Sequence, residues 1–561
     1  MSESTTLSRR SFLAGAGAVI AATAATTLTG CASESSTEAD WLPKNWDYET
    51  DVLVVGYGGA GLWAAVTAKD EGESDVLVLE KAPSRGGGSS SINMGEYAWV
   101  EDPEKANAYI QAFTKGMTPE DISLAWAEEC YKNMDYCDKW GVPTEMKKGA
   151  NAAGGGASCE YPQLEGGETM RVCSFGDPAE GGNSGWKVLD QVRADLGIEV
   201  VFSCHDESLI QNPETKEIVG VYTLIGDDET PKAVKARKGV ILTMGGFEHN
   251  EELKKQYLKC YPAMGFYGWP FNTGDGIKMV QDVGAQLWNM SNACGSYCGY
   301  FKDSEWPYAF WLTPLANSYV MLDQKGKRWW KESDFMSPHT GFHNFVHFDE
   351  ETVGYDRCPT WFVFDQKVID AGAIGQLAGG IMNTPSGMTK IGMGLDDIPE
   401  ECGKFAGWSE DNSAEIEKGW IVKGDTLEEL AENMAKVDSA PPADAMKETL
   451  ERYNGFCTEG VDADLERDPA TMVPISMDGP FYAYPVYPGG NNTMGGPKKN
   501  ADGQVLNLDD EPIPRLFAGG SFGNMQAHTY GISGGNNAEN MVWGRICARS
   551  ASKLEPWDAA N

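Results

Sequence analysis

Basic residues are scarce in this chain of 561 residues, because 45 lysines and arginines stand against 83 aspartates and glutamates. The formal net charge is −38, which repels nucleic acid and anionic membrane surfaces. We therefore expect no nucleic-acid partner, and we interpret the charge as favouring solubility outside the cell. The single mildly apolar run, near the N-terminus, is too short and too mild to predict a membrane span.

Cysteine is sparse and irregularly spaced. The 13 cysteines are scattered over a large chain, which excludes a disulfide-dense scaffold. There is no Cys-x-x-Cys-His for covalent haem and no regular Cys-x-x-Cys series for a ferredoxin-type cluster. Cys294 and Cys298 are the closest non-trivial pair, and we interpret them as buried thiols, with cluster ligands as the alternative.

Glycine, by contrast, is abundant, at 66 of 561 residues. This exceeds the roughly 7 % of an average protein, so many positions need a tight turn or a close backbone approach to a ligand. The length suffices for two or three domains with sizeable cores. This composition favours a globular protein with a bound cofactor.

The N-terminus predicts the compartment. Arg9 and Arg10 precede a weakly apolar run, which resembles a Tat signal for export of folded proteins. The run ends in Leu-Thr-Gly before Cys31, which resembles a lipobox, with an ordinary cleaved signal as the alternative. We expect residues 1–30 to be the signal and residues 31–45 a polar tether. The lipid anchor would be the chain's one membrane attachment, on the extracytoplasmic face of the cytoplasmic membrane.

Apolar runs that stop at glycine or at an acid predict buried strands, and one helical stretch closes the chain. The strands are expected at residues 51–55, 75–79, 238–243 and 514–518, and the helix at 536–552. Strands that return to one Gly-rich edge from distant parts of the sequence predict a single α/β domain with an insertion. We place the domain at residues 46–290 and 491–561 and the insertion, richer in aromatic residues and methionine, at 291–490.

A dinucleotide-binding motif follows the first predicted strand and opens a helix. It consists of Gly56, Tyr57, Gly58, Gly59, Ala60 and Gly61. In this pattern the first glycine permits the turn, the second lets the backbone approach a pyrophosphate, and the third packs helix on strand. Glu80 ends the next strand 19 residues after Gly61, where the ribose-binding carboxylate belongs.

Further segments favour FAD over NAD. The loop that starts at Lys81 and the segments Asn272–Gly276 and Phe517–Ser521 resemble phosphate-contacting and other FAD-binding segments of flavoproteins. Their order over 46–290 and 491–550 resembles the flavoprotein family of soluble fumarate reductases, urocanate reductases and ketosteroid dehydrogenases. The resemblance implies a Rossmann-like FAD-binding domain, with the insertion as an α+β cap that closes over substrate. The remaining cofactor contacts that it implies are Lys81, Gly87, Gly88, Ser89, Asp275, Gly520 and Asn536.

The fumarate reductase pattern is incomplete here. Ile532 stands where those enzymes have an arginine before Gly-Gly-Asn, and Asn492 stands where they have a histidine before Thr-Met-Gly-Gly. The proton-donating arginine expected about eight residues after Arg328 is also missing from residues 329–336. A dicarboxylate would lose its strongest charge-assisted contacts, so we expect no fumarate reduction.

The same C-terminal segment is more similar to ketosteroid dehydrogenases, where a tyrosine and a glycine four residues later bind the substrate carbonyl. Tyr530 and Gly534 have this spacing. The alternative is that Tyr530 only packs beside the flavin. The final helix, expected from about Asn536, would direct its positive N-terminus at the flavin, with Asn536 and Asn537 as caps.

Histidines offer further candidates. His339, His343 and His347 are spaced by four, so a metal site, a substrate-facing acid or simple packing all remain open. His528, two residues from Tyr530, is the preferred polar group near substrate, and we expect no metal. Trp306, Tyr308, Phe310 and Trp311 line an aromatic or steroid-sized pocket, or else fill the core.

Together these features predict an FAD-dependent terminal reductase of anaerobic respiration, which passes hydride from flavin N5 to an enone, enoate or related acceptor. Because no second nucleotide fingerprint or haem motif is present, we expect a separate membrane-bound donor, cytochrome or quinol-linked, to supply electrons. Two alternatives remain: a ketosteroid-type dehydrogenase that runs in the oxidative direction, and a flavin-containing binding or sensor lipoprotein.

Overall fold

The computed structural model describes residues 41–93, 95–147, 159–180, 184–259, 265–266, 268–301, 309, 312, 314–334, 339, 341–375 and 408–559. The predicted signal and most of the predicted tether lie outside the described residues, as do Trp306, Tyr308, Phe310 and Trp311. Within the described residues, no helix combines the length and the apolarity that crossing a membrane requires.

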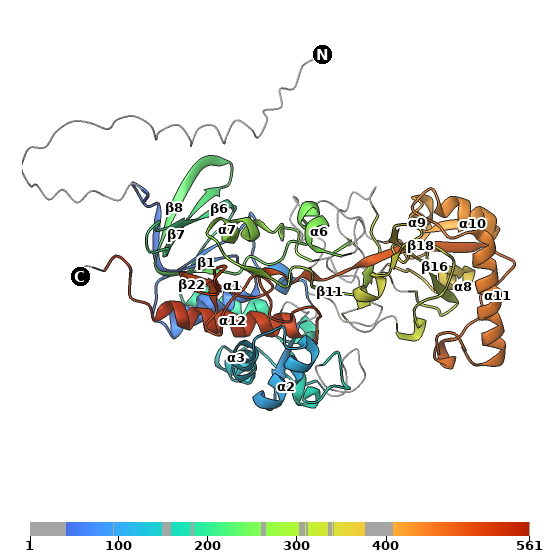
Figure 1. Cartoon of the computed structure of the whole chain (residues 1–561), viewed down its shortest axis with the longest axis horizontal. Helices are drawn as coiled ribbons and strands as arrows, with labels where there is room; N and C mark the ends of the chain where they lie inside the picture. Colours follow the sequence, from blue (N-terminus) through green and yellow to red (C-terminus); the bar gives the residue numbers. More distant parts are fainter. Residues whose placement is uncertain are drawn as a thin grey trace, which may run out of the picture. The chain divides into compact units, whose positions relative to one another are not determined.

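A mostly parallel sheet contains β1, β8 and β22, which lie in the left half of Figure 1. In the described part of the chain it has eight strands, six of them in the order β21-β22-β8-β1-β2-β5. Their bounds are β21 Gln504–Leu506, β22 Pro512–Ala518, β8 Asp228–Leu242, β1 Tyr48–Val55, β2 Val76–Leu79 and β5 Glu199–Val201. All adjacent pairs from β22 to β5 are parallel, and β21 is antiparallel. The α/β fold class is confirmed.

β8 is longer than the predicted strand at 238–243. Its last residues pair with β1 and β22, whereas its first part pairs antiparallel with β7, Ile218–Ile225. β7 in turn pairs with β6, Cys204–Gln211, and the pair extends the sheet. The sequence did not predict that β8 begins this early, because polar and apolar residues mix along its first part and no continuous apolar run marks it.

The first and last helices of this domain pack against each other beside the sheet (Figure 1). They are α1, Gly59–Asp70, and α12, Gly535–Ser552. Small side chains on both, together with the strands β1 and β8, form one continuous core. The predicted helix at 536–552 is therefore confirmed, and it begins one residue earlier.

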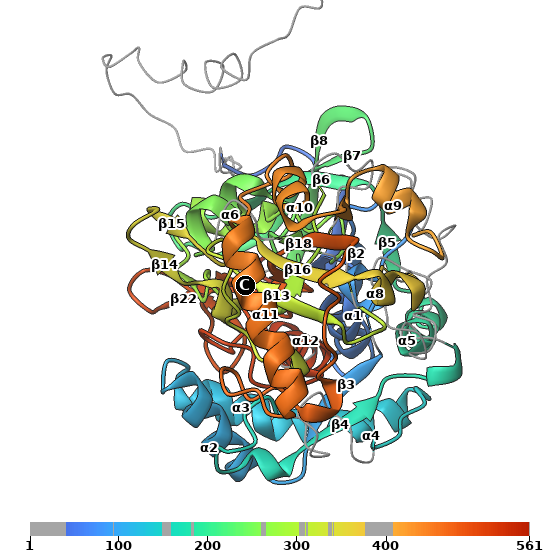
Figure 2. The same cartoon turned by 90° about the vertical axis from the view of Figure 1, so that its right-hand side faces the viewer.

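A second sheet is built mainly from residues of the predicted insertion. In the described residues it has six strands, with β18, Phe481–Gly490, pairing with β12, β16, β17 and β9. The others are β9 Gly265–Phe266, β12 Tyr297–Cys298, β13 Tyr319–Leu322, β16 Thr360–Asp365 and β17 Val422–Gly424. Apolar residues of α10, Leu427–Met434, and α11, Ala443–Glu459, pack on it (Figure 2). The domain boundaries at 290 and 490 stay a prediction.

The cysteines of the described residues have free thiols. Cys294 and Cys298 are fully buried, as we predicted for this pair. No group of three or more histidines, cysteines or acids in the described residues is placed to hold a metal ion.

Candidate functional site

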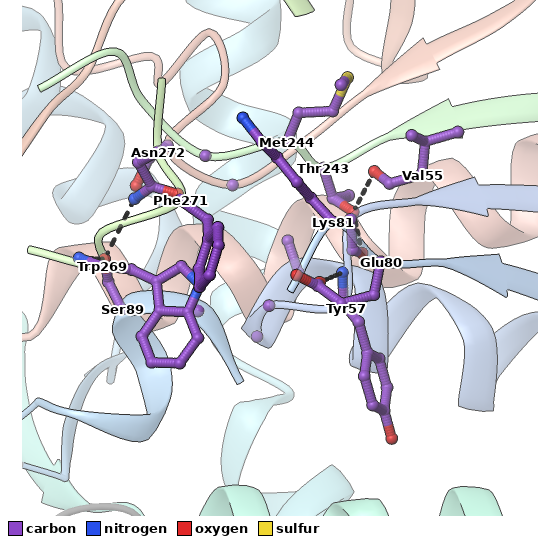
Figure 3. Close-up of a pocket in the computed structure, with 18 of the residues that line it drawn as sticks. Val55, Tyr57, Glu80, Lys81, Ser89, Thr243, Met244, Trp269, Phe271 and Asn272 are labelled. Carbon is purple, nitrogen blue, oxygen red and sulfur yellow. Dashed lines mark hydrogen bonds between the residues drawn. The ribbon is translucent and has the colours of Figure 1, made fainter. Parts of the chain in front are cut away.

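Four parallel strands of the central sheet end at one edge, and the predicted cofactor segments follow them there. β1 leads into Gly56, β2 into Glu80, β8 into Thr243, and β22 into Gly519. These segments line a cavity of about 800 Å³ at the carboxyl ends of the strands, the usual ligand position in such folds. In Figure 3, Trp269, Phe271 and Asn272 lie on the left, and Tyr57, Glu80 and Lys81 lie on the right.

The glycine motif at the start of α1 has two different spatial requirements. A Cβ at Gly61 would lie 1.9 Å from the carbonyl oxygen of Gly56, so the strand-to-helix turn itself requires glycine there. A Cβ at Gly58 would meet no protein atom closer than Gly88 Cα at 3.9 Å. The space beside Gly58 therefore belongs to the cavity, as expected where a backbone must approach a pyrophosphate.

Glu80 lies where a ribose-binding carboxylate is expected. Its two oxygens accept backbone N–H groups of Tyr57 and Ala82, each at 2.8 Å, which fixes the side chain at the cavity wall. Burial raises the pKa of Glu80, although both amides and the charge of Lys81 act in the opposite direction. Each oxygen retains a second lone pair, so the carboxylate can still accept a ribose hydroxyl.

The other predicted cofactor contacts gather around the same cavity. Lys81 forms an ion pair with Asp275 at 2.6 Å, and the Ser89 hydroxyl accepts the Trp269 N–H at 3.2 Å. Gly87 does not line the cavity but donates its N–H to the Tyr57 carbonyl at 2.8 Å, which holds the loop against the motif. The predicted contacts that do line it are Gly56, Gly58, Gly59, Ala60, Glu80, Lys81, Gly88, Ser89, Asp275 and Gly520.

A second cavity of about 880 Å³ adjoins the first, since Ser89, Ser90, Ser521 and Asn540 line both. Its wall is rich in side-chain amides: Asn93, Asn491, Asn492, Asn536, Asn537 and Asn540. Neither lysine nor arginine occurs among the described residues that line it. Apart from Glu96 and His339, the described lining residues offer neutral hydrogen-bonding groups, and none of them is an arginine that could form a bidentate contact with a carboxylate.

Tyr530 and Gly534, which the resemblance implies as the carbonyl-binding pair, line this second cavity together with Asn536. The Tyr530 hydroxyl accepts the Asn536 backbone N–H at 3.4 Å, and the Asn536 amide donates to Asn492 at 2.8 Å. Burial, with smaller effects of Cys294 and Glu160, raises the pKa of Tyr530 well above its ordinary value. Tyr530 therefore remains a neutral hydroxyl donor across the working pH range.

The start of α12 differs from the expectation in one respect. Its N-cap is Gly534, with φ of 70°, and no side chain caps it, so the prediction of Asn536 and Asn537 as caps is wrong. Both asparagines lie inside the first turn and use their side chains on neighbouring segments instead. The first turn carries no acid, so its partial positive charge is open to the cavity.

The histidines lie in different environments from those expected. His339 lines the second cavity, and its Nδ1 lies 2.9 Å from Glu160 Oε1. His528, the preferred histidine, is not among the residues that line this cavity, and burial lowers its pKa. His347 pairs with Asp356 at 2.7 Å, and residues 341–345 form a short 3-10 helix, so the three histidines do not share a helical face.

Glu160 was missed by the sequence interpretation. Its side chain is fully buried, and Oε1 accepts the Ser533 hydroxyl at 2.5 Å in addition to His339. It lies in a loop after a stretch with no recognisable motif, so no local signal marks it. Ile532, at the position of the missing arginine, is fully buried in an apolar cluster and does not line the cavity.

The sequence matches the family described as FAD binding domain over residues 51–305 and 308–538. It is 28 % identical to a 3-oxosteroid 1-dehydrogenase of Mycolicibacterium smegmatis, over 89 % of this chain and 96 % of that protein. It is 27 % identical to a digoxin reductase of Eggerthella lenta, over 98 % of each. The fold is similar to that of a 3-ketosteroid delta1-dehydrogenase from Sterolibacterium denitrificans, with a TM-score of 0.70, 21 % identity, and coverage of 90 % of this chain and 99 % of that one.

Proposed function

The chain belongs to the FAD binding domain family, and from this premise we propose that it reduces an activated carbon–carbon double bond in an uncharged organic substrate. FAD as the cofactor, and an FAD-dependent oxidoreductase that acts on CH–CH groups, are confirmed by the family match and by the relatives. The resemblance to ketosteroid dehydrogenases and reductases is likewise confirmed.

The residues of the first cavity fit FAD. The open space beside Gly58 and the free N-terminus of α1 suit the pyrophosphate, and the Glu80 carboxylate suits the ribose. When bound and reduced, FAD supplies a hydride. The first turn of α12 would stabilise negative charge on the flavin ring, because its N–H groups carry partial positive charge.

The amide-rich second cavity is the observation that carries the choice of substrate. Tyr530 and the Gly534 N–H would bind a carbonyl oxygen and stabilise the enolate charge that develops on it. A dicarboxylate would find no arginine or lysine among the described lining residues, and Glu96 there would repel it. A neutral enone or a related uncharged acceptor fits this wall.

The electron supply and the location remain part of the proposal. We expect a separate membrane-bound donor, cytochrome or quinol-linked, on the outer face of the cytoplasmic membrane. The twin arginines and Cys31 support Tat export followed by lipid anchoring. In that arrangement the anchor keeps the reductase beside its donor.

An anaerobic screen tests the function. Chemically reduced holoprotein is mixed with paired acceptors, each an enone and the matching enoate, with fumarate included, and flavin absorbance is followed. We expect the enones to reoxidise the flavin faster than the enoates. Fastest reoxidation by fumarate would contradict the substrate class. Tight binding of an acceptor without reoxidation would favour a sensor. Reduction of the oxidised flavin by saturated ketones that is faster than reoxidation of the reduced flavin by enones would favour the dehydrogenase direction.

A further inference from the structure

We propose that His339 is the acid that protonates the substrate, and that Glu160 is the residue that positions it. This inference rests on the proposed reduction of a double bond. It starts from the contact between a cavity-lining histidine and a carboxylate that is fully buried. Among the described residues that line the second cavity, there is no arginine that could serve as the proton donor.

The geometry leaves one ring nitrogen of His339 available. Nδ1 is held by Glu160 at 2.9 Å, and the His339 backbone carbonyl accepts the Gly295 N–H at 2.6 Å. The ring is thus held through Nδ1 and the backbone through its carbonyl, while 40 % of the side chain remains exposed. Nε2 is then the atom that can carry a proton to a ligand, in the same way that a carboxylate orients an imidazole in other acid–base pairs.

His339 and Tyr530 lie close enough to act on one small molecule, because their ring centroids are 5.5 Å apart. The carbonyl oxygen and the α-carbon of an enone are separated by two bonds. With the oxygen at Tyr530, the α-carbon lies toward the space that His339 also borders. The two side chains would then divide the work between oxygen binding and proton delivery.

The chemical step balances with these groups. The π bond of the alkene breaks, the β-carbon gains a hydride from the reduced cofactor, and the α-carbon gains the Nε2 proton. The substrate would take up the two electrons that reduced FAD supplies when bound. His339 is left neutral and regains a proton from solvent.

The surroundings of Glu160 suit a positioning role. Oε1 accepts both His339 and the Ser533 hydroxyl, and Oε2 is buried without a hydrogen-bond partner in the described part of the chain. Its backbone N–H donates to the Gly531 carbonyl at 3.1 Å, so the carboxylate is tied to the segment that carries Tyr530.

The charges that face His339 support the protonated form. The titratable groups around it in the described residues are Glu160, Glu96 and Tyr530. Burial lowers the pKa of His339, but the Glu160 charge, its hydrogen bond and Glu96 outweigh this and raise the pKa above its ordinary value. His343, in contrast, has its pKa lowered to about 4 by burial and by His528, so it is neutral at pH 7.

Two variants and one control test the assignment. In wild-type holoprotein, the rate of single-turnover reoxidation by the best acceptor should stay constant as the pH rises to the His339 pKa. Above that pH the rate should decline, because the protonated fraction of His339 falls. Glu160→Gln should move this decline to lower pH, since the negative charge that raises the His339 pKa is gone. His339→Gln should abolish the decline and slow reoxidation by about 10²–10⁴-fold. Asp356→Asn disrupts the comparable pair with His347. It should change neither the rate of reoxidation nor the pH at which the rate declines.

A second readout does not depend on turnover. The chain has six histidines, so their ring signals can be titrated individually by NMR in protein carrying ¹⁵N-labelled histidine. We expect the His339 midpoint to fall in Glu160→Gln and to stay unchanged in Asp356→Asn. An unchanged midpoint in Glu160→Gln overturns the positioning role. A shifted midpoint with an unchanged rate profile overturns the acid role. Failure of every acceptor with wild-type protein instead refutes the proposed reduction, and the acid role with it.

Discussion

Replacing Gly58 by alanine adds one methyl group at the start of α1, and the structure separates its effect on folding from its effect on cofactor binding. Gly58 has φ of −81° and ψ of −168°, which any residue adopts. The new Cβ would lie 3.9 Å from Gly88 Cα and 4.0 Å from the Gly87 carbonyl oxygen, both ordinary contacts. A glycine-to-alanine change without strain stabilises a protein by about 0.4–1 kcal/mol, so the apoprotein should unfold at the same temperature or slightly higher.

The same methyl group occupies the space where the pyrophosphate is expected. Forcing one extra methyl into a packed contact costs about 1–3 kcal/mol. At about 1.4 kcal/mol per factor of ten, the FAD dissociation constant should rise by about 5- to 140-fold. The assays are fluorescence titration of apoprotein with FAD and thermal unfolding of the apoprotein.

Gly61→Ala is the matched control, since its Cβ would lie 1.9 Å from the Gly56 carbonyl oxygen and 2.8 Å from Thr243 Oγ1. It should destabilise the apoprotein by about 3 kcal/mol or more, because the backbone turn must shift. A Gly58→Ala protein with wild-type FAD affinity would refute the position of the pyrophosphate. A Gly58→Ala apoprotein as unstable as Gly61→Ala would refute the argument from space.

Three further predictions concern the substrate site and the leader. Tyr530→Phe should slow hydride transfer by about 10²–10³-fold with unchanged FAD content, because one of two carbonyl donors is lost; an unchanged single-turnover rate would move the carbonyl site elsewhere. Ile532→Arg should give no fumarate reduction and should lower the melting temperature, since it buries an unpaired charge in an apolar cluster; a stable variant that reduces fumarate would contradict this. Replacing Arg9 and Arg10 by lysine should block export, and Cys31→Ser should release the protein from membranes, as cell fractionation can measure; attachment that persists without Cys31 would rule out the lipid anchor.

The cofactor half of the molecule was predictable from sequence because its signals are local. The strand, glycine motif and helix that precede Glu80 occupy one continuous stretch, and each element has its own period or turn residues. The closing helix was likewise placed to within one residue. Its cap was not, because Gly534 and two following asparagines all suit such a position and only the backbone conformation distinguishes them.

The substrate half was less predictable because its contacts join distant segments. Glu160 and His339 are 179 residues apart in sequence, and no spacing rule connects them. His528 was preferred since it is near Tyr530 in sequence, yet the chain turns between them and only Tyr530 reaches the cavity. Ile532 was also judged from sequence alone, because it stands where fumarate reductases have an arginine. That comparison does not reveal that the Ile532 side chain packs in the core.

The pairing of β22 with β8, and of α12 with α1, has a consequence for how the protein is made. β8 pairs with β1 and β7, which precede it, but its other parallel neighbour, β22, comes from much later in the chain, as does α12. Contacts of such sequence separation also form slowly. The FAD cradle is therefore complete only after β22 and α12 have been synthesised and have packed against β8 and α1. The proposed Tat export, which accepts folded cargo, would suit this order of assembly, whereas threading an unfolded chain across a membrane would separate it from FAD.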